Sequence, residues 1–374
     1  MDLYQDNPTS DALRAIAAEV LIIDDIEQLE QGELRALRFV GQLRMEAQAA
    51  YDTVAPRIRA MGYTPLLRQE GDRVALLIAP PFPPATPSRL WLALLLFVLT
   101  VASTIYVGGQ DINWTTGEPV YRLGQGLAFS AALLSILLAH ELGHYIVARR
   151  EGVAVSYPFF IPMPLFLLGT MGAFISIKEP VPNRRALLAI AIAGPLAGLA
   201  VAIPVLLIGL ALSEVHNIAE VQAALPNVGF FTEGNSLLYA AAKILVFGRF
   251  LPSGGYDVYM HPVALAGWAG LLVTGLNLLP AGQLDGGHIF FALFGPRAAQ
   301  AMSMLVAVAL IGLGFLWSGW FLWAVLVALL GQQRSPLLNE VSPLQGPWRA
   351  LAVVGLVVFA LVFTPVPITM SVVP

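Results

Sequence analysis

The sequence contains no cysteine, and only 12% of its 374 residues are charged. Without thiols the chain can form neither disulfides nor thiolate metal sites, so a transition metal must be held by imidazole and carboxylate groups. Lysine and arginine number 20 against 24 acidic residues, and since neither sign dominates we expect no nucleic-acid partner. Apolar residues, in contrast, make up 57% of the chain. This composition lies outside the range of soluble domains and predicts a membrane protein.

The N-terminus also lacks the basic segment and short apolar run of a secretory signal peptide, because it begins MDLYQDNPTSDAL. We therefore expect it to stay in the cytoplasm. Residues 1–80 contain no apolar run long enough to cross a bilayer. Their periodicity predicts strands over 34–43 and 63–69, a helix over 46–61 and a last strand ending near residue 79, which together form a small soluble α+β domain.

Residues 81–88 are rich in proline and predict a stiff linker to a membrane domain at 89–374. The predicted fold is a polytopic α-helical membrane protein with about seven transmembrane helices, each near the ~20 residues that cross a hydrocarbon core. With a cytoplasmic N-terminus, this count places most basic residues of the connecting segments inside, as the positive-inside rule requires. The apolar spans lie at 89–107, 122–148, 186–212, 262–280, 298–315, 319–332 and 348–366.

Between the second and third spans, residues 152–183 are apolar but interrupted by proline and glycine, so they cannot form a continuous helix. Non-helical backbone at membrane depth survives only against protein or a water-filled cavity. We predict a re-entrant or hairpin segment beside a functional site. Within it, 169–177 alternates as a strand does, and its edge at Gly172, Ala173 and Phe174 could bind an extended substrate. A purely structural strand explains the pattern equally well.

The central motif is HELGH, His140–His144, inside the otherwise apolar second span. Residues four apart lie about 40° apart on one helix face, so both imidazoles can reach one tetrahedral zinc ion. Glu141 projects about 100° from His140, where a general base for water would stand. The alternative is a helix whose polar residues only form hydrogen bonds within the bundle. A glutamate in a bilayer costs at least about 2–3 kcal/mol, which favours a functional role.

A catalytic zinc normally has three protein ligands, so a third must come from elsewhere in the chain. Asp285 stands out in NLLPAGQLDGGH, because proline and glycine let the backbone turn tightly at the inner end of the fourth span. Asp285 and His140 are predicted to reach a similar depth and could share a metal. As an alternative, Asp285 could cap the next helix. His288 is a weaker candidate ligand, and His216 and His261 are expected to be ordinary loop residues.

Asn277 lies in the apolar fourth span, where an interhelical hydrogen bond is its simplest role. As a functional alternative, it could clamp the substrate or donate an amide hydrogen bond to a developing oxyanion, since it lies two turns before Asp285. The segment 194–198 in the third span, with Gly194, Pro195 and Gly198, is interpreted as a site of close helix packing and kinking, without a chemical role.

The pairing of HELGH in a hydrophobic helix with NLLPAGQLDGG one span later resembles the site-2 protease family of intramembrane zinc metalloproteases, peptidase family M50. The likeness extends over most of the membrane region. The segments at 158–162, 193–198 and 339–349 resemble its plastid and cyanobacterial branch. The resemblance implies a three-helix catalytic core within about 122–295. It also implies one zinc ion per chain and the residues that serve it: His140, His144 and Asp285 as ligands, Glu141 activating water and Asn277 assisting.

We therefore predict an intramembrane metalloprotease that hydrolyses a peptide bond in or near the transmembrane segment of a membrane-protein substrate, in regulated intramembrane proteolysis. The expected surroundings are the lipid bilayer of a bacterial plasma membrane or, alternatively, of a thylakoid or plastid. Two rival functions are an intramembrane metal transporter and an inactive protease-like chaperone. A transporter predicts several ligand sets along a path, whereas this sequence has one cluster. An inactive relative usually lacks the glutamate or a histidine of the motif.

Nothing in the sequence indicates the oligomeric state. No PDZ-like insertion is evident in the predicted external loop at 213–260, and no CBS pair follows the last span. Substrate selection therefore stays open. The size and position of the N-terminal domain suggest the hypothesis that it recognises or gates substrates.

Overall fold

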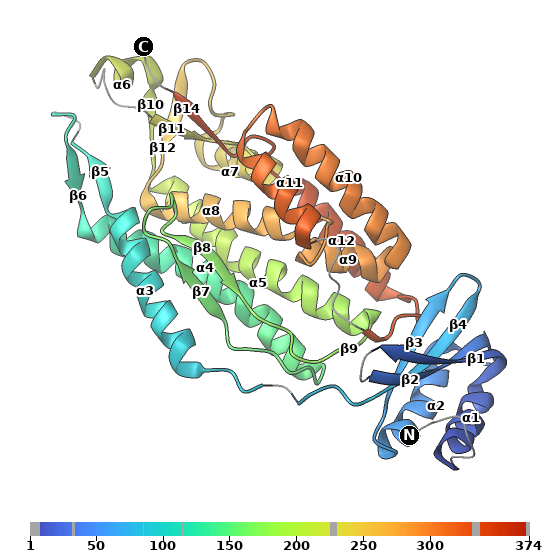
Figure 1. Cartoon of the computed structure of the whole chain (residues 1–374). Coiled ribbons are helices and arrows are strands. Elements are labelled where there is room, and N and C mark those ends of the chain that lie inside the picture. The colour runs from blue at the N-terminus through green and yellow to red at the C-terminus, as the bar shows by residue number, and fades with distance from the viewer. Residues whose placement is uncertain are drawn as a thin grey trace.

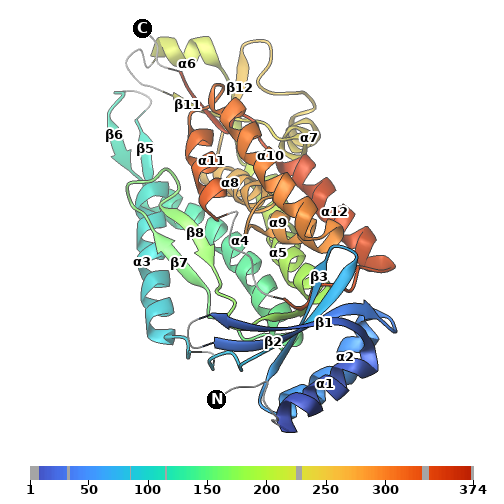
Figure 2. The same cartoon turned by 45° about the vertical axis from the view of Figure 1, so that its right-hand side comes forward.

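The computed structural model describes residues 8–31, 34–84, 86–113, 116–224, 230–330 and 337–371. Figure 1 shows a small domain at the N-terminal end, in blue, below an elongated region of helices that holds the rest of the chain. The second view agrees that this domain lies at one end of the molecule, while α6 (Ile218–Ala224) and the strands near it lie at the other (Figure 2).

The N-terminal domain contains the strands and the helix predicted for it, which are therefore confirmed. Glu46 caps the predicted helix by accepting a hydrogen bond from the backbone N–H of Ala49, and residues spaced three and four apart form its buried face. A first helix and a first strand were not predicted. The observed elements are α1 (Pro8–Val20), β1 (Leu21–Gln31), β2 (Leu34–Leu43), α2 (Ala47–Ala60), β3 (Thr64–Glu70) and β4 (Arg73–Ala79).

The sheet of this domain continues into the membrane region, in the order β1-β2-β4-β3-β13-β9. β13 (Leu337–Asn339) pairs parallel with both β3 and β9 (Val181–Asn183). Gln48 of α2 reinforces the junction, because its Oε1 accepts hydrogen bonds from Nδ2 of Asn183 at 3.2 Å and of Asn339 at 3.3 Å. The N-terminal region is thus joined to the membrane region by a shared sheet as well as by the linker. The predicted domain boundaries stay a prediction.

Each predicted apolar span coincides with a helix. Four of the helices among the described residues are long and apolar enough to cross a membrane: α3 (Leu90–Gly108), α4 (Leu123–Arg150), α5 (Arg184–Ala211) and α10 (Pro296–Gly314). Shorter apolar helices are α7 (Leu237–Phe247), α8 (Pro262–Asn277), α11 (Gly319–Leu330) and α12 (Pro347–Val362). The composition and these helices agree with a membrane protein, and the count of seven spans stays a prediction.

Helices α4, α5 and α8 lie side by side in the middle of the bundle, with α3 flanking α4 (Figures 1 and 2). Small residues let them approach closely. A Cβ atom added to Gly143 of α4 would lie 2.5 Å from the carbonyl oxygen of Ala193 in α5, and one added to Gly267 of α8 would lie 2.6 Å from Cα of Leu206. Close packing through small residues is the usual way in which membrane helices associate.

The interrupted segment between α4 and α5 forms the predicted hairpin. β7 (Phe159–Pro162) and β8 (Thr170–Phe174) pair antiparallel in a sheet of only these two strands, so one edge of β8 faces no other strand of the described chain. Ser103 of α3 fixes the hairpin by donating a hydrogen bond to the carbonyl oxygen of Gly169 at 2.6 Å. This contact satisfies a backbone carbonyl group of the segment that the sequence predicted to need protein contacts.

Residues 213–260, predicted as an external loop, contain several regular elements at the end of the molecule opposite the N-terminal domain. β10 (Glu214–Asn217) pairs with β12 (Tyr256–Tyr259), and β11 (Phe230–Glu233) pairs with β14 (Ile368–Ser371) near the C-terminus. Another hairpin, β5 (Gln110–Ile112) and β6 (Pro119–Tyr121), joins α3 to α4 at the same end. Helix α9 (Asp285–Phe294) lies between α8 and α10 in the sequence.

Candidate metal centre

Helix α4 carries the HELGH motif in its buried part. His140, Glu141 and His144 are 4%, 5% and 6% exposed, although α4 is otherwise a largely apolar helix. Burial of polar side chains in a membrane bundle is costly unless they find partners. The partners of the two histidines come from α5, α8 and α9.

The turn between α8 and α9 brings Asp285 to the two histidines. Gly282 adopts a φ of 58°, and a Cβ atom on Gly286 would lie 1.9 Å from the carbonyl oxygen of Leu278, so the chain folds back more tightly than a larger residue permits. Asp285 is the first residue of α9, and the capping position is Leu284. The alternative that Asp285 is an N-cap is therefore wrong.

Three donor atoms converge at the centre of the site. Nε2 of His140 and Nε2 of His144 lie 3.1 Å apart, and each lies 3.3 Å from Oδ2 of Asp285. Ligands of a tetrahedral zinc ion at about 2.0–2.1 Å must be about 3.3 Å apart. The triangle therefore fits zinc. In the described part of the chain this is the only group of three or more histidine, aspartate or glutamate donors within 4.8 Å of one another.

Helix α5 orients one of these ligands. Nδ1 of His144 lies 2.8 Å from the carbonyl oxygen of Ile190, and because a carbonyl can only accept, Nδ1 carries the proton. The lone pair of Nε2 is then free for a metal, as is usual for histidine ligands held by a second hydrogen bond.

Two glycines of α5 pack directly against the imidazole rings. The sequence did not predict this contact. A Cβ atom on Gly194 would lie 2.1 Å from Nε2 of His144, and one on Gly198 would lie 3.2 Å from Cβ and Nδ1 of His140. The close packing predicted for these glycines is confirmed, but their neighbours are the imidazole rings themselves. The four-residue spacing of the glycines was the signal available in the sequence.

The donors open into a cavity of about 220 Å³. Glu141 lines it beside the two histidines, and the hairpin contributes Ala173 and Phe174 of β8, whereas Gly172 precedes them in the strand without lining the cavity. Apolar side chains form much of the remaining wall: Ile175, Ile177, Leu187, Ile190 and Leu284. One part of the cavity lining, around the donor atoms, is thus polar, and the rest is largely apolar.

The other sequence candidates are distributed between this site and the outer end. Nδ2 of Asn277 lies 3.3 Å from Nε2 of His140, so the asparagine belongs to the site. His288 lines the same cavity but is outside the group of converging donors. His261 accepts a hydrogen bond from the N–H of Val263 and caps α8. His216 lies in β10, where Nε2 is 3.1 Å from Glu214.

Comparison with known proteins identifies the family. The sequence model of peptidase family M50 matches residues 128–318, about half of the chain and the whole of the site just described. The chain belongs to peptidase family M50. The resemblance to this family in the sequence is therefore confirmed. No solved structure matches the chain.

Relatives in plants support the plastid branch of peptidase family M50, which the sequence motifs resemble. "Probable zinc metalloprotease EGY1, chloroplastic" of Oryza sativa subsp. japonica is 34% identical over 307 residues, which are 75% of this chain and 52% of that protein. "Probable zinc metalloprotease EGY2, chloroplastic" of Arabidopsis thaliana is 30% identical over 375 residues, which are 96% of this chain and 65% of that protein. The chain thus spans between half and two thirds of the length of these two relatives.

Proposed function

We propose that this protein is a zinc metalloprotease that hydrolyses a peptide bond in or near the transmembrane segment of a membrane-protein substrate. The observation that carries the proposal is the triangle of His140, His144 and Asp285 donors, 3.1 to 3.3 Å apart, with Glu141 in the same cavity. Family membership and the names of the plant relatives support it.

In this proposal His140, His144 and Asp285 hold one zinc ion per chain. The bound ion supplies a Lewis acid that polarises the scissile carbonyl and acidifies water. Glu141 accepts the proton of the attacking water and passes it to the leaving amine. Asn277, whose Nδ2 lies against His140, donates a hydrogen bond to the substrate oxygen as negative charge develops there.

The hairpin provides the substrate-binding edge. A transmembrane helix must unwind before a protease can reach its backbone, and an extended segment can then add to a strand edge. β8 has such an edge beside the cavity, so we propose that Gly172, Ala173 and Phe174 hold the substrate as a strand. The apolar wall of Ile175, Ile177 and Leu187 then contacts the hydrophobic side chains of a transmembrane segment.

The enzyme is proposed to act in regulated intramembrane proteolysis, with its N-terminal domain on the cytoplasmic or stromal side. The chloroplast relatives favour a plastid or thylakoid membrane, and a bacterial plasma membrane is the alternative. A metal transporter is less well supported, because the described residues contain one group of converging donors instead of several along a path.

Purified protein in proteoliposomes tests the proposal by cleavage of a transmembrane peptide and by zinc uptake. Glu141→Gln should lower kcat by about 10³-fold or more, because it removes the general base, and should leave the zinc content unchanged. Glu214→Gln, which changes an exposed carboxylate of β10, is the matched control and should cleave normally. Substantial turnover by Glu141→Gln would exclude it as the base. Zinc uptake without cleavage would favour the transporter.

A further inference from the structure

A second and larger cavity, of about 340 Å³, lies at the outer end of the molecule and shares no lining residue with the metal centre. It lies among α6, β10, β11, β12 and β14, opposite the N-terminal domain (Figure 1). β12 ends three residues before α8 begins, and the 16 residues of α8 span about 24 Å to Asn277. The outer cavity is therefore remote from the reacting atoms.

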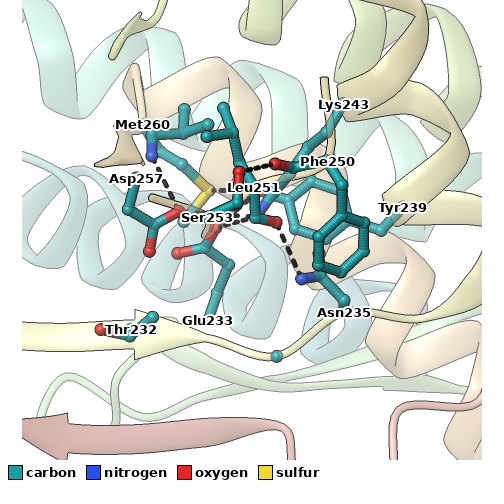
Figure 3. Close-up of polar contacts among 12 residues, drawn as sticks. Thr232, Glu233, Asn235, Tyr239, Lys243, Phe250, Leu251, Ser253, Asp257 and Met260 are labelled. Carbon is teal, nitrogen blue, oxygen red and sulfur yellow. Dashed lines mark hydrogen bonds and ion pairs between the residues drawn. The ribbon is translucent and has the colours of Figure 1, made fainter. Parts of the chain in front are cut away.

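A fully buried lysine lies behind this cavity. Lys243 of α7 is 0% exposed, and its Nζ lies 2.9 Å from Oε1 of Glu233 and 3.8 Å from Oδ1 of Asp257. Nζ also donates to the carbonyl oxygen of Leu251, and the hydroxyl of Tyr239 donates to Oε1 of Glu233 at 2.8 Å (Figure 3). One ammonium group thus faces two carboxylates.

The two carboxylates leave one negative charge in excess, and both residues line the cavity. Oε2 of Glu233 has no hydrogen-bond partner among the described residues, although this side chain is only 6% exposed. Oδ1 of Asp257 accepts from the N–H of Val258, and Oδ2 likewise has no partner in the described chain. Burial, and then the nearby Glu233 carboxylate, raises the pKa of Asp257, as expected where negative charge is incompletely compensated.

The rim of the cavity is aromatic and apolar. Phe231 and Tyr259 both line it and are 58% and 41% exposed, and Ile218 of α6 lies beside them. Aromatic faces next to unpaired carboxylate oxygens attract organic cations. The volume is within the range of about 300–1,000 Å³ typical of ligand pockets. A divalent metal ion fits less well, because Lys243 already contacts one oxygen of each carboxylate, which leaves two free oxygens where such an ion takes six or more oxygen ligands.

We propose that the outer cavity binds the side chain of an arginine or lysine in a polypeptide segment that lies outside the membrane, on the side opposite the N-terminal domain. The two unpartnered carboxylate oxygens accept hydrogen bonds from the guanidinium or ammonium group, which charge makes stronger than neutral ones. The exposed rings of Phe231 and Tyr259 contact the residues that flank the basic one. This site is independent of the proteolysis proposed for the metal centre.

Binding of a fluorescent, otherwise uncharged peptide with one central arginine to the full-length protein in detergent tests this site. The arginine peptide should bind saturably, and its glutamine analogue at least about tenfold more weakly, because a charged hydrogen-bonding group is lost. Asp257→Asn should weaken binding of the arginine peptide by a similar factor. Glu118→Gln removes an exposed carboxylate just before β6, outside the cavity lining, and should change binding of the arginine peptide by less than about twofold.

Two further variants keep the test decisive. Asp285→Ala should bind the peptide normally, because its side chain is in the other cavity, and loss of binding there would overturn the proposal. If Asp257→Asn does not fold, Thr369→Lys places a competing ammonium group in the cavity and should abolish binding. Equal binding of the arginine and glutamine peptides would refute recognition of a cation. Free arginine amide that binds as tightly as the peptide would refute a polypeptide ligand.

Discussion

The protein buries charged side chains in two places, and the two places treat their charge differently. At the outer end, the carboxylates of Glu233 and Asp257 have a cation from the chain itself, Lys243. At the metal centre, the carboxylate of Asp285 and two imidazoles point their lone pairs at one another, with no lysine or arginine lining the cavity. Converging donors without a counter-charge are costly to bury. The difference indicates that the outer group is held by a cation of the chain itself, with one negative charge left over, and that the group at the metal centre is built around an ion from outside.

The sharpest test of this contrast is removal of one carboxylate from each place. Asp285→Ala should lower zinc affinity by on the order of 10³-fold or more, because binding free energy of zinc is shared among few ligands. Asp257→Ala, the matched change at the outer end, should leave zinc binding unchanged. Metal analysis after dialysis against zinc buffers measures both. An Asp285→Ala protein with full zinc content would remove this residue from the ligand set.

The cation of the outer group provides the complementary test. Lys243→Met should lower the free energy of unfolding by about 3 kcal/mol, because it removes the ammonium group that faces the largely buried carboxylates of Glu233 and Asp257. Denaturation in detergent micelles measures the loss. The double variant Lys243→Met/Glu233→Gln should recover part of it, since one of the stranded charges is then gone. A single variant as stable as the wild type would show that water already compensates these carboxylates.

A smaller effect on zinc affinity is expected from a substitution in α5, where glycine packs against the histidine ligands. Gly194→Ala should lower zinc affinity about 10- to 100-fold, the range typical of residues that orient a ligand, because the added methyl group would lie 2.1 Å from Nε2 of His144. Gly312→Ala in α10 is the control, since nothing lies within 4 Å of its added carbon. Circular dichroism should show equal helix content in both. Normal zinc affinity in Gly194→Ala would mean that the imidazole moves aside without cost.

The smallest effect concerns the junction with the N-terminal domain. Gln48→Ala removes two hydrogen bonds to asparagine side chains and should destabilise the shared sheet by about 1 kcal/mol. Faster amide exchange in β13 is the expected readout. Arg73→Ala, which changes an exposed position of β4, is the control. Gln28→Ala is not suitable, because the side-chain amide of Gln28 is buried. Unchanged exchange in β13 would show that backbone pairing alone holds the junction.

The sequence was sufficient to predict the donors of the metal centre, because their chemistry is rare in a bilayer. HELGH places two imidazoles on one helix face, and a glycine-rich turn after a span favours a tight return. The geometry that joins them was open, since the N-cap role for Asp285 fitted the same pattern. The contact between Gly194 of α5 and the imidazole of His144 could not be predicted, because it exists only once α4 and α5 pack together.

The outer group and the sheet junction left weaker signals. Lys243 is a single lysine in an apolar helix, which suggests a buried partner, but Glu233 and Asp257 lie on separate strands that the sequence does not pair. β13 is three residues long and has no alternating pattern. β1 carries acidic residues along an edge of the sheet, so its strand periodicity is masked. Contacts between distant short segments depend on the tertiary fold.

The strand β13 has a practical consequence for any attempt to study the membrane part by itself. β3 covers one side of β13, so a protein that lacks residues 1–80 exposes backbone N–H and C=O groups along that side of β13. Uncovered strand edges recruit other chains and promote aggregation. Aggregation or loss of activity in such a shortened protein could then result from the exposed strand edge and not from a lost recognition function. A shortened protein in which another strand pairs with β13 separates the two causes.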